Sequence, residues 1–526
     1  MSIKKTADPQ SGAYNITRRS LMTTVAASAA ASVAGLATAK PNHQAIARAA
    51  ASSAEISHWD ITTDVLVAGS GAAGISAAID ARRAGAEVLV VEKLNKLGGS
   101  SALSGGVIYA GGGTALQKAL GFEDSVESMY NYIVESGRKH PHLDKIQLYC
   151  EESVAHFDWL LENGVPYNKV YSDGKGLGFD EAGLYYSGSE EAWPWRDKFK
   201  PAPRGHVPWE KGHQGGRRLM QALFASADAL GVKSLKKVSG ERLVVESDGR
   251  VVGMIASVKG ERKTIRARRG VVLACGGFIH NREMVKLYAP ELYDCSVPWA
   301  NAGDLGLGIQ MGMGVGAAAL RMDQGFAIGP VYPPENTIAG IAVNANGQRF
   351  TSEEGYHAVM GNDVTYKHNG VAYFICDKDS DRPQGSDGQP LIATADTIAE
   401  LEKRAGFPSG GLQMTVEYYN RHAEKGKDPM FHKSKKYLSA IDKPPFKVYD
   451  LSVDRAQYSS HTFGGLQTRP NSQVVNIWGE DIPSLYAAGR TTSGLPTSPY
   501  IASGISVGDC TFFGRMAGQS AAANKA

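Results

Sequence analysis

One stretch, "DVLVAGSGAAGISAAIDARRAGAEVLVVEK" at residues 64–93, constrains the fold more than any other part of the chain. An apolar run over 64–68 predicts a buried strand, small residues after it predict a helix, and a second apolar run over 87–91 predicts another strand. In a G-x-G-x-x-G turn the first glycine permits the tight bend, the second lets the backbone approach a pyrophosphate, and the third lets helix and strand pack closely. Three glycines stand at this spacing between the first strand and the helix: Gly69, Gly71 and Gly74. The stretch therefore predicts a dinucleotide-binding βαβ unit.

The residues after this unit favour FAD as the dinucleotide. Glu92 ends the second strand ~20 residues beyond the glycine turn, where a carboxylate accepts hydrogen bonds from ribose hydroxyls. The segment "NKLGGSSALSGGVIYAGGGT" at 95–114 adds glycine-rich turns that suit a flavin along its length. The alternative for the first glycine turn is a helix N-terminus whose glycines serve packing alone, and the alternative for 95–114 is a surface loop. The contacts expected from this region are Gly69, Gly71, Ala72, Ala73, Gly74, Glu92, Lys93, Gly99, Ser100, Ser101, Gly105 and Gly106.

The N-terminal segment accounts for the charge of the chain. The net charge is +3, and residues 1–39 carry that excess, so the remainder is close to neutral and gives no reason to expect nucleic acid as a partner. Arg18-Arg19 precedes an alanine-rich run and a small-residue cleavage site, which predicts a twin-arginine signal peptide over 1–39 and export to the periplasm. An alanine-rich disordered leader or short helix is the alternative. No other run has the ~20 apolar residues that span a bilayer, so we expect no membrane-spanning segment.

Apolar periodicity and turn residues predict the elements of the remaining chain. Before the insertion they are a linker over 40–57, a mostly helical region over 120–235 with its clearest amphipathic stretch at 146–164, a hairpin over 242–258 and a strand over 270–278. A mixed insertion follows near 300–455, with a strand beside an Asn-Gly turn at 346–347 and a helix at 396–406. The chain ends with a strand over 482–489 and a helix of small residues from 506 onward. Five cysteines lie scattered without C-x-x-C spacing, so no disulfide framework or metal site is predicted.

Seven motifs, in order along residues 64–518, give the chain a family resemblance. They are the βαβ stretch, "GGSSALSGG", "GVVLACGGF", "NANGQRFTSEE", "HTFGGL", "IPSLYAAG" and "GDCTFFGRMAG". The chain resembles the FAD-containing fumarate reductase/3-ketosteroid dehydrogenase flavoproteins. The resemblance implies an α/β fold in which a Rossmann-like FAD-binding domain, formed by 58–300 and 456–526, carries an inserted α+β substrate-capping domain over 301–455. It also implies cofactor contacts from Gly276, Gly277, His461, Gly489, Arg490, Ser503 and Ile505.

Two departures from the reductase pattern point to a neutral substrate. Pro499-Tyr500 stands where those reductases carry an arginine that grips a carboxylate, and Tyr356 stands where they carry a second arginine. The segment "PYIASG" is similar to the Tyr-x-x-x-Gly element of 3-ketosteroid dehydrogenases, which implies that Tyr500 and Gly504 bind the C3 carbonyl of a steroid. The segments "SGGVIYAGGGT" and "AAGRTTSG" favour the members that desaturate C4–C5 of 5α-3-oxosteroids. In the second segment, Arg490 stands where reductases usually have a glutamate.

The same resemblance implies roles for further residues. Tyr356 is expected to take the α-proton, with Glu353 or His357 relaying it, although the reverse assignment with Tyr500 as base stays open. Ser503 is either a carbonyl contact or a helix N-cap, and Tyr109 borders the pocket or belongs to the core.

Three alternative functions remain open. One is dehydrogenation at C1–C2, and another is a periplasmic fumarate-type reductase of a different enoate with Arg382 as proton donor. The third is a flavin-binding carrier without a substrate of its own. The sequence does not identify the electron acceptor.

Overall fold

The predicted βαβ unit forms the middle of a nine-stranded sheet. The computed structural model describes residues 49–137, 142–174, 181–209, 215–329, 335–381 and 388–525. In it β2 (Ile61–Ala68) and β3 (Val88–Glu92) are parallel neighbours, and α2 (Ala72–Arg83) connects them. Gly69 adopts a φ of +107°, and a Cβ added there would lie 2.2 Å from the carbonyl oxygen of Ala274. The prediction of two strands, a glycine turn and a helix is confirmed.

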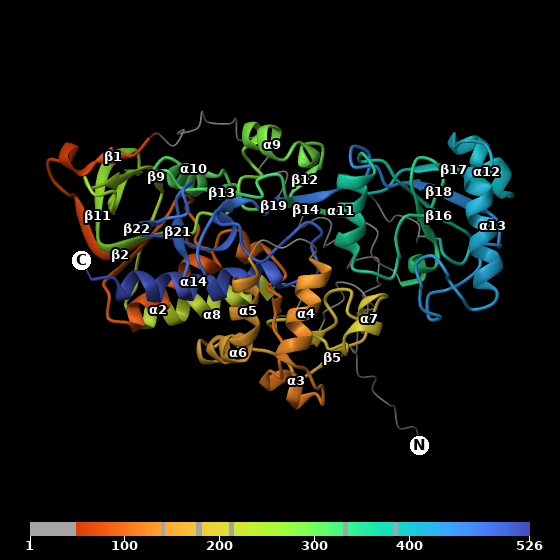
Figure 1. Cartoon of the computed structure of the whole chain (residues 1–526), viewed down its shortest axis with the longest axis horizontal. Coiled ribbons are helices and arrows are strands. Elements are labelled where there is room, and N and C mark those ends of the chain that lie inside the picture. The colour runs from red at the N-terminus through yellow and green to blue at the C-terminus, as the bar shows by residue number, and fades with distance from the viewer. Residues whose placement is uncertain are drawn as a thin grey trace, which may run out of the picture. The chain divides into compact units, whose positions relative to one another are not determined.

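The long strand β11 (Glu261–Leu273) organises the rest of this sheet (Figure 1). It pairs in parallel with β2 and with β22, and antiparallel with β10. The predicted hairpin is confirmed, because β9 and β10 pair antiparallel. The remaining strands of the sheet are β1 (Ala51–Ser52), β8 (Lys233–Lys236), β9 (Val238–Val245), β10 (Val251–Val258), β21 (Gln473–Val475) and β22 (Asp481–Ala487).

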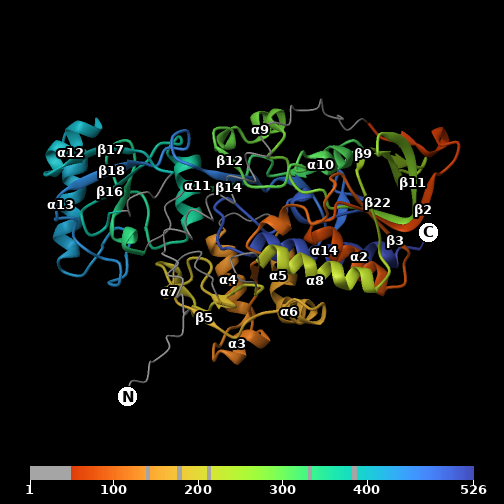
Figure 2. The same cartoon turned by 180° about the vertical axis from the view of Figure 1, so that it is seen from behind.

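Helices α2, α8 (Gly215–Ala229) and α14 (Ile505–Ala523) lie together beside this sheet, as Figures 1 and 2 both show. The contact between α14 and α2 is close because glycines of α14 face the backbone of α2. A Cβ added at Gly514 would lie 2.3 Å from the carbonyl oxygen of Ala73, and one at Gly518 would lie 2.1 Å from that of Ala77. Small residues in the C-terminal helix therefore allow two backbones to meet.

Part of the segment predicted to be a linker belongs to the sheet. Strand β1 pairs in parallel with β9, and Ala51 is fully buried in a small apolar cluster. Arg242 donates hydrogen bonds to the carbonyl oxygens of Ala49 and Ala50, which fixes the chain just before β1. The predicted signal peptide lies outside the described residues. In the portion of the chain that the structure describes, no helix has the length and apolarity that a membrane crossing requires.

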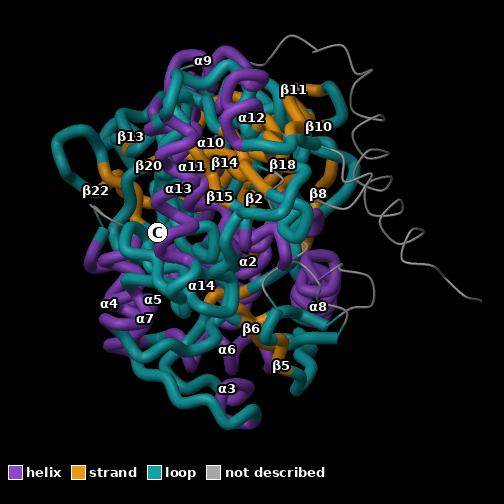
Figure 3. Tube along the Cα trace, turned by 90° about the vertical axis from the view of Figure 1, so that its right-hand side faces the viewer, coloured by secondary structure: helices purple, strands orange, loops and turns teal. Residues whose placement is uncertain are grey.

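A layer of short helices and a small sheet follows the βαβ unit. The predicted amphipathic stretch at 146–164 is two helices, α5 and α6, that meet at Glu152. Figure 3, coloured by secondary structure, shows this part below the main sheet. Its elements are α3 (Ala115–Ala119), α4 (Val126–Ser136), α5 (Leu143–Glu151), α6 (Ser153–Glu162), α7 (Trp195–Lys198), β4 (Ile108–Tyr109), β5 (Tyr171–Ser172), β6 (Leu184–Tyr185) and β7 (Gly205–His206).

The inserted region contains a separate four-stranded sheet in the order β15-β16-β18-β17 (Figure 1, right). The Asn-Gly turn after β15 is confirmed, since Gly347 has a φ of +72°. Residues 301–320 were predicted to belong to the insertion, yet α10 (Leu307–Met313) packs near β9. The elements of the inserted sheet and its helices are α11 (His357–Lys367), α12 (Ile398–Ala405), α13 (Gly411–Ala423), β15 (Ile341–Val343), β16 (Tyr373–Cys376), β17 (Leu391–Ala395) and β18 (Phe446–Asp450).

Short strands join the inserted region to the FAD-binding part. Strand β19 lies between β12 and β14, and β13 pairs with β20. Helix α9 precedes this junction. The bounds are α9 (Arg282–Tyr288), β12 (Val297–Pro298), β13 (Ala319–Leu320), β14 (Gly325–Ile328), β19 (Ser459–Thr462) and β20 (Gly465–Leu466). The strand predicted over 482–489 and the helix predicted from 506 onward are confirmed as β22 and α14.

Substitutions of two glycines in the first turn, Gly71 and Gly74, should differ in their effects on stability and on FAD binding. A Cβ at Gly74 would lie 1.9 Å from the carbonyl oxygen of Gly69, whereas one at Gly71 would meet only the Ser101 hydroxyl, at 3.6 Å. We expect Gly74→Ala to lower the free energy of unfolding by about 1–3 kcal/mol, because the helix must move off the strand. Gly71→Ala should cost less than about 1 kcal/mol and weaken FAD binding instead. Urea titration and FAD titration measure the two effects, and equal destabilisation by both variants would contradict the assignment.

Candidate active site

A cavity that is partly open to solvent lies at the carboxyl ends of β2, β3 and β11. Ligands of open α/β sheets bind at this edge. Many residues predicted to contact the cofactor line it. They are Gly69, Gly71, Ala72, Ala73, Glu92, Lys93, Gly99, Ser100, Ser101, Gly276, Gly489 and Arg490.

Other predicted contacts lie outside the lining of this cavity, and the structure gives several of them a packing role. Gly74 packs against the glycine turn, and Gly106 meets the backbone of Gly215 and Gly216 at the start of α8. A Cβ at Gly277 would lie 2.4 Å from the Thr462 hydroxyl. The cavity lining also leaves out four further predicted contacts: Gly105, His461, Ser503 and Ile505.

The donor and acceptor groups around the cavity fit a dinucleotide. Helix α2 starts at Ala72, whose amide donates to the Ser101 hydroxyl at 3.1 Å, and the positive end of its dipole faces the cavity. Glu92 is buried and accepts hydrogen bonds from the Ser70 amide at 3.1 Å and the Ser70 hydroxyl at 2.6 Å. Asp304 and Arg490 form an ion pair of 2.9 Å, yet both carboxylate oxygens of Asp304 have no hydrogen bond within the described chain. A ribose or ribityl hydroxyl would supply such partners.

The predicted catalytic residues come together beyond this cavity. The Tyr356 hydroxyl lies 2.7 Å from the Ser503 Oγ, and the rings of Tyr356 and Tyr500 have centroids 6.1 Å apart. Gly504, with a φ of +97°, precedes α14 directly, and an added Cβ there would lie 2.7 Å from the Tyr109 amide nitrogen. Tyr356 comes from the inserted region and Ser503 from the segment before α14. The site therefore joins segments that are far apart in sequence.

A third segment, which the sequence analysis missed, completes this cluster. Ser187 accepts a hydrogen bond from the Ser503 amide at 2.8 Å through its carbonyl, and its hydroxyl donates to the Ser503 carbonyl at 2.9 Å. The Ser189 hydroxyl accepts from the Tyr356 amide at 2.7 Å. Tyr185, at the end of β6, lies near the side chain of Ser503. The only sequence signal is the run "YYSGSEE", which carries no motif.

Burial controls the electrostatics of the tyrosines. It raises the pKa of Tyr356 well above its ordinary value, and the hydrogen bond with Ser503 opposes that rise. Burial also raises the pKa of Tyr500 well above its ordinary value. Both phenols are therefore neutral at physiological pH. The Tyr500 oxygen accepts a hydrogen bond from the Ser506 amide at 3.1 Å, which leaves its proton to donate elsewhere.

Two histidines near the tyrosines are neutral for the same reason. Burial lowers the pKa of His357 to about 3 and lowers that of His461 well below its ordinary value. His461 stacks on Phe326 with ring centroids 4.7 Å apart, and its ring faces Tyr500 edge-on at 6.3 Å. Tyr109 belongs to the core, where its hydroxyl donates to Glu190 at 2.9 Å.

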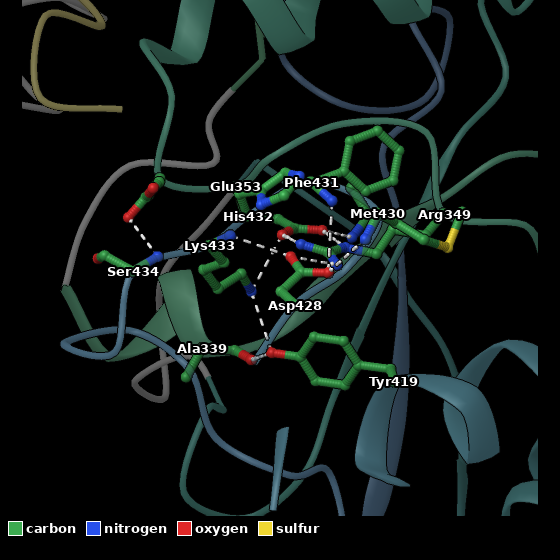
Figure 4. A network of polar contacts seen from close by, with 12 residues as sticks. Ala339, Arg349, Glu353, Tyr419, Asp428, Met430, Phe431, His432, Lys433 and Ser434 are labelled. Carbon is green, nitrogen blue, oxygen red and sulfur yellow. Dashed lines mark hydrogen bonds and ion pairs between the residues drawn. The ribbon is translucent and has the colours of Figure 1, made fainter. Parts of the chain in front are cut away.

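Glu353 does not suit the relay role that we expected for it. Its buried carboxylate pairs with Arg349 at 2.6 Å and with Lys433 at 3.0 Å (Figure 4). It also accepts a hydrogen bond from the Ala342 amide at 3.0 Å. Arg349 also pairs with Asp428 at 2.8 Å. These cations outweigh burial and lower the pKa of Glu353 to about 2, so it remains an anion. Arg382, the alternative proton donor, lies outside the described residues.

Comparisons with known proteins agree with this geometry. The sequence model of the FAD binding domain family matches residues 64–507. The structure is similar to that of a 3-ketosteroid-Δ4-(5α)-dehydrogenase from Rhodococcus jostii RHA1 in complex with 4-androstene-3,17-dione. The two are 40% identical with a TM-score of 0.84, over 90% of this chain and 99% of that one.

Two curated relatives represent both branches of the resemblance. A 3-oxo-5-alpha-steroid 4-dehydrogenase of Comamonas testosteroni is 28% identical, over 83% of this chain and 94% of its own length. A probable fumarate reductase of Shewanella frigidimarina is also 28% identical, over 88% of this chain and 75% of its own length. The expected family resemblance and its FAD cofactor are confirmed.

The buried cluster around Glu353 predicts a large stability effect. We expect Glu353→Gln to lower the free energy of unfolding by about 3–5 kcal/mol, because Lys433 loses a buried counterion. The pKa of Glu353 is lowered from 4.5, so its stabilisation is complete above pH 4.5 and declines as the pH falls toward about 2. The difference between wild type and variant should therefore shrink in acid. Urea denaturation across this pH range measures it.

The matched control for this prediction is Glu417→Gln. Glu417 pairs with Arg421 at 2.8 Å on an exposed helix face, and such pairs contribute less than about 1 kcal/mol. If the two variants were equally stable, the role of the Glu353 cluster would be refuted.

Proposed function

The chain belongs to the FAD binding domain family and is an FAD-dependent oxidoreductase, and from this premise we propose that it dehydrogenates a 3-oxosteroid between C4 and C5. The observation that carries the proposal is the pairing of Tyr356 with Ser503 beside Tyr500 and Gly504. These groups offer neutral hydroxyls and an amide, which suit a ketone oxygen better than a carboxylate. Similarity to two proteins named as Δ4-(5α) or 4-dehydrogenases of steroids favours C4–C5 over C1–C2.

The carbonyl of the substrate is bound by Tyr500 and Gly504. A C–H bond next to a ketone becomes acidic when hydrogen bonds stabilise the developing enolate oxygen. The Tyr500 phenol keeps its proton for this purpose, because its oxygen accepts the Ser506 amide. The amide of Gly504 lies in the same turn, where only glycine fits. Both donors are held by backbone that α14 fixes in place.

The α-proton is taken by Tyr356. Burial disfavours a free phenolate at this position, so the phenol proton must leave as the substrate proton arrives. The Ser503 hydroxyl, 2.7 Å away, accepts it and in the same step releases its own proton toward solvent, so Ser503 acts as a relay. The reverse assignment, with Tyr500 as base and Tyr356 as carbonyl donor, uses the same atoms. When bound, FAD supplies the acceptor for the hydride from the β-carbon.

Flavin bleaching tests the reaction directly. We expect a saturated 5α-3-oxosteroid to bleach the bound flavin under anaerobic conditions, because it carries the C4 and C5 hydrogens to be removed. The corresponding 4-ene-3-one and succinate should leave the absorbance unchanged. Bleaching by the 4-ene-3-one would move the reaction to C1–C2. Inertness toward both steroids, with fumarate or another enoate reoxidising the chemically reduced flavin, would replace the proposal with an enoate reductase.

Two hydroxyl deletions test the assignment of residues. Tyr500→Phe should lower kcat/KM by roughly 10²–10³-fold, which is typical for the loss of one oxyanion donor. Tyr356→Phe should lower kcat by about 10²–10⁴-fold, the usual contribution of a positioned base. Flavin content should be unchanged in both. Tyr458→Phe is the matched control, since its buried hydroxyl donates to the Leu451 carbonyl outside the site. Wild-type rates in either active-site variant would contradict its role.

A further inference from the structure

The five residues before Ser498, Ser493–Thr497, form a strap that leads directly into the segment with Tyr500 and Ser503. Three charged side chains from different parts of the chain face this strap: the buried Lys145 on α5, the half-buried Arg321 after β13 and the buried Asp509 on α14. The mechanism above uses none of them.

Arg321 makes the largest set of contacts with the strap. Its Nε donates to the Ser493 hydroxyl at 2.9 Å and its Nη1 to the Pro496 carbonyl at 3.0 Å, while its Nη2 donates to the Gly494 carbonyl. The backbone of Arg321 has a φ of 51°, a left-handed conformation that is strained for a residue other than glycine. Such strain persists only where the surroundings enforce it. Burial lowers the pKa of Arg321 to about 10, so the guanidinium stays charged at neutral pH.

Lys145 and Asp509 hold the strap from its other sides. The Nζ of Lys145 lies 3.4 Å from the Ser493 carbonyl and also donates to the Thr468 hydroxyl. Asp509 accepts the Leu495 amide at 2.8 Å. A Cβ at Gly494 would lie 2.5 Å from the Asp509 carboxylate, so the strap passes close to this anion. Backbone carbonyls of the strap thus face the cationic side chains of Arg321 and Lys145, and the Leu495 amide faces the Asp509 carboxylate.

The turn that carries Arg321 also holds the next residues of the active-site segment. Gln324 accepts the Ser498 amide at 3.2 Å, and the Ser498 hydroxyl donates to the Gly325 carbonyl at 2.8 Å. Asn362 connects this turn to Tyr500, because it donates to the same Gly325 carbonyl at 3.0 Å and accepts the Tyr500 amide at 3.2 Å. The contacts therefore run without a break from Arg321 to Tyr500.

We propose that Arg321 is a positioning residue, which sets the place of Tyr500 and Ser503 by fixing the strap through its hydrogen bonds to Ser493, Gly494 and Pro496. Arginine suits this task because its planar fork donates in several fixed directions, whereas lysine is a single point donor. A displacement of ~1 Å in a reacting group can cost about 10²-fold in rate. The expected effect on the reaction rate rests on the proposed function. The hold of Arg321 on the strap does not, because it can be measured without any substrate.

The first test is hydrogen exchange of FAD-loaded protein followed by mass spectrometry, with Arg321→Met, Arg321→Lys and Arg242→Met. Arg242 is the matched control, since it too donates to two backbone carbonyls, those of Ala49 and Ala50. We expect the peptide containing Leu495 to exchange at least about tenfold faster in Arg321→Met, because the strap opens locally. Arg321→Lys should be intermediate and Arg242→Met unchanged there. Wild-type exchange of this peptide in Arg321→Met would overturn the proposal.

The second test is the kinetic effect of the same variants with a 5α-3-oxosteroid. Arg321→Met should lower kcat by roughly 10–10²-fold at unchanged flavin content, with KM changing less than kcat and Arg321→Lys partly restoring the rate. Faster exchange with a wild-type kcat would overturn the positioning role. If the wild-type protein fails to react with steroids while the strap still opens in Arg321→Met, the proposed function fails and the hold on the strap stands.

Discussion

The close packing of α14 on α2 is the contact on which both halves of the site depend. Helix α2 starts after the glycine turn that faces the cofactor cavity, and α14 starts after Gly504, next to Ser503. Glycines of α14 sit against backbone carbonyls of α2, so neither helix can slide without a steric clash. Interiors packed to this density respond to a single added methyl group. The packing of these two helices therefore fixes the glycine turn of the cofactor cavity relative to the start of α14.

The chemistry of the site follows from its low polarity. Burial raises the pKa values of Tyr356 and Tyr500, and it lowers those of His357 and His461. A site of neutral donors suits a neutral ligand group, because burying a carboxylate there would carry a desolvation cost. Several formal charges stand in clusters that hold backbone segments. Glu353 with Arg349 and Lys433 is one such cluster, and Arg321 with Lys145 and Asp509 is another.

The sequence predicted what depends on local spacing and missed what depends on long-range contact. The glycine turn, β2, β3, α2 and the hairpin of β9 and β10 each follow from periodicity within a few dozen residues, and all were correct. Tyr356, Ser503 and Gly504 were named because they occupy motif positions. The segment from Tyr185 to Ser189 could not be found, because its role arises only where it meets Ser503 and Tyr356 in the fold. Glu353 was given a relay role because its neighbours Arg349 and Lys433 cannot be paired with it from sequence alone.

The division of the site between two parts of the chain has a physical consequence. Tyr356 enters from the start of α11 in the inserted region, and Ser503 enters from the segment before α14. The hydrogen bond between their side chains forms only when the two parts meet, and each residue is separately tied to the segment around Ser187 and Ser189. The contact between the Tyr356 and Ser503 side chains therefore depends on the mutual placement of all three segments.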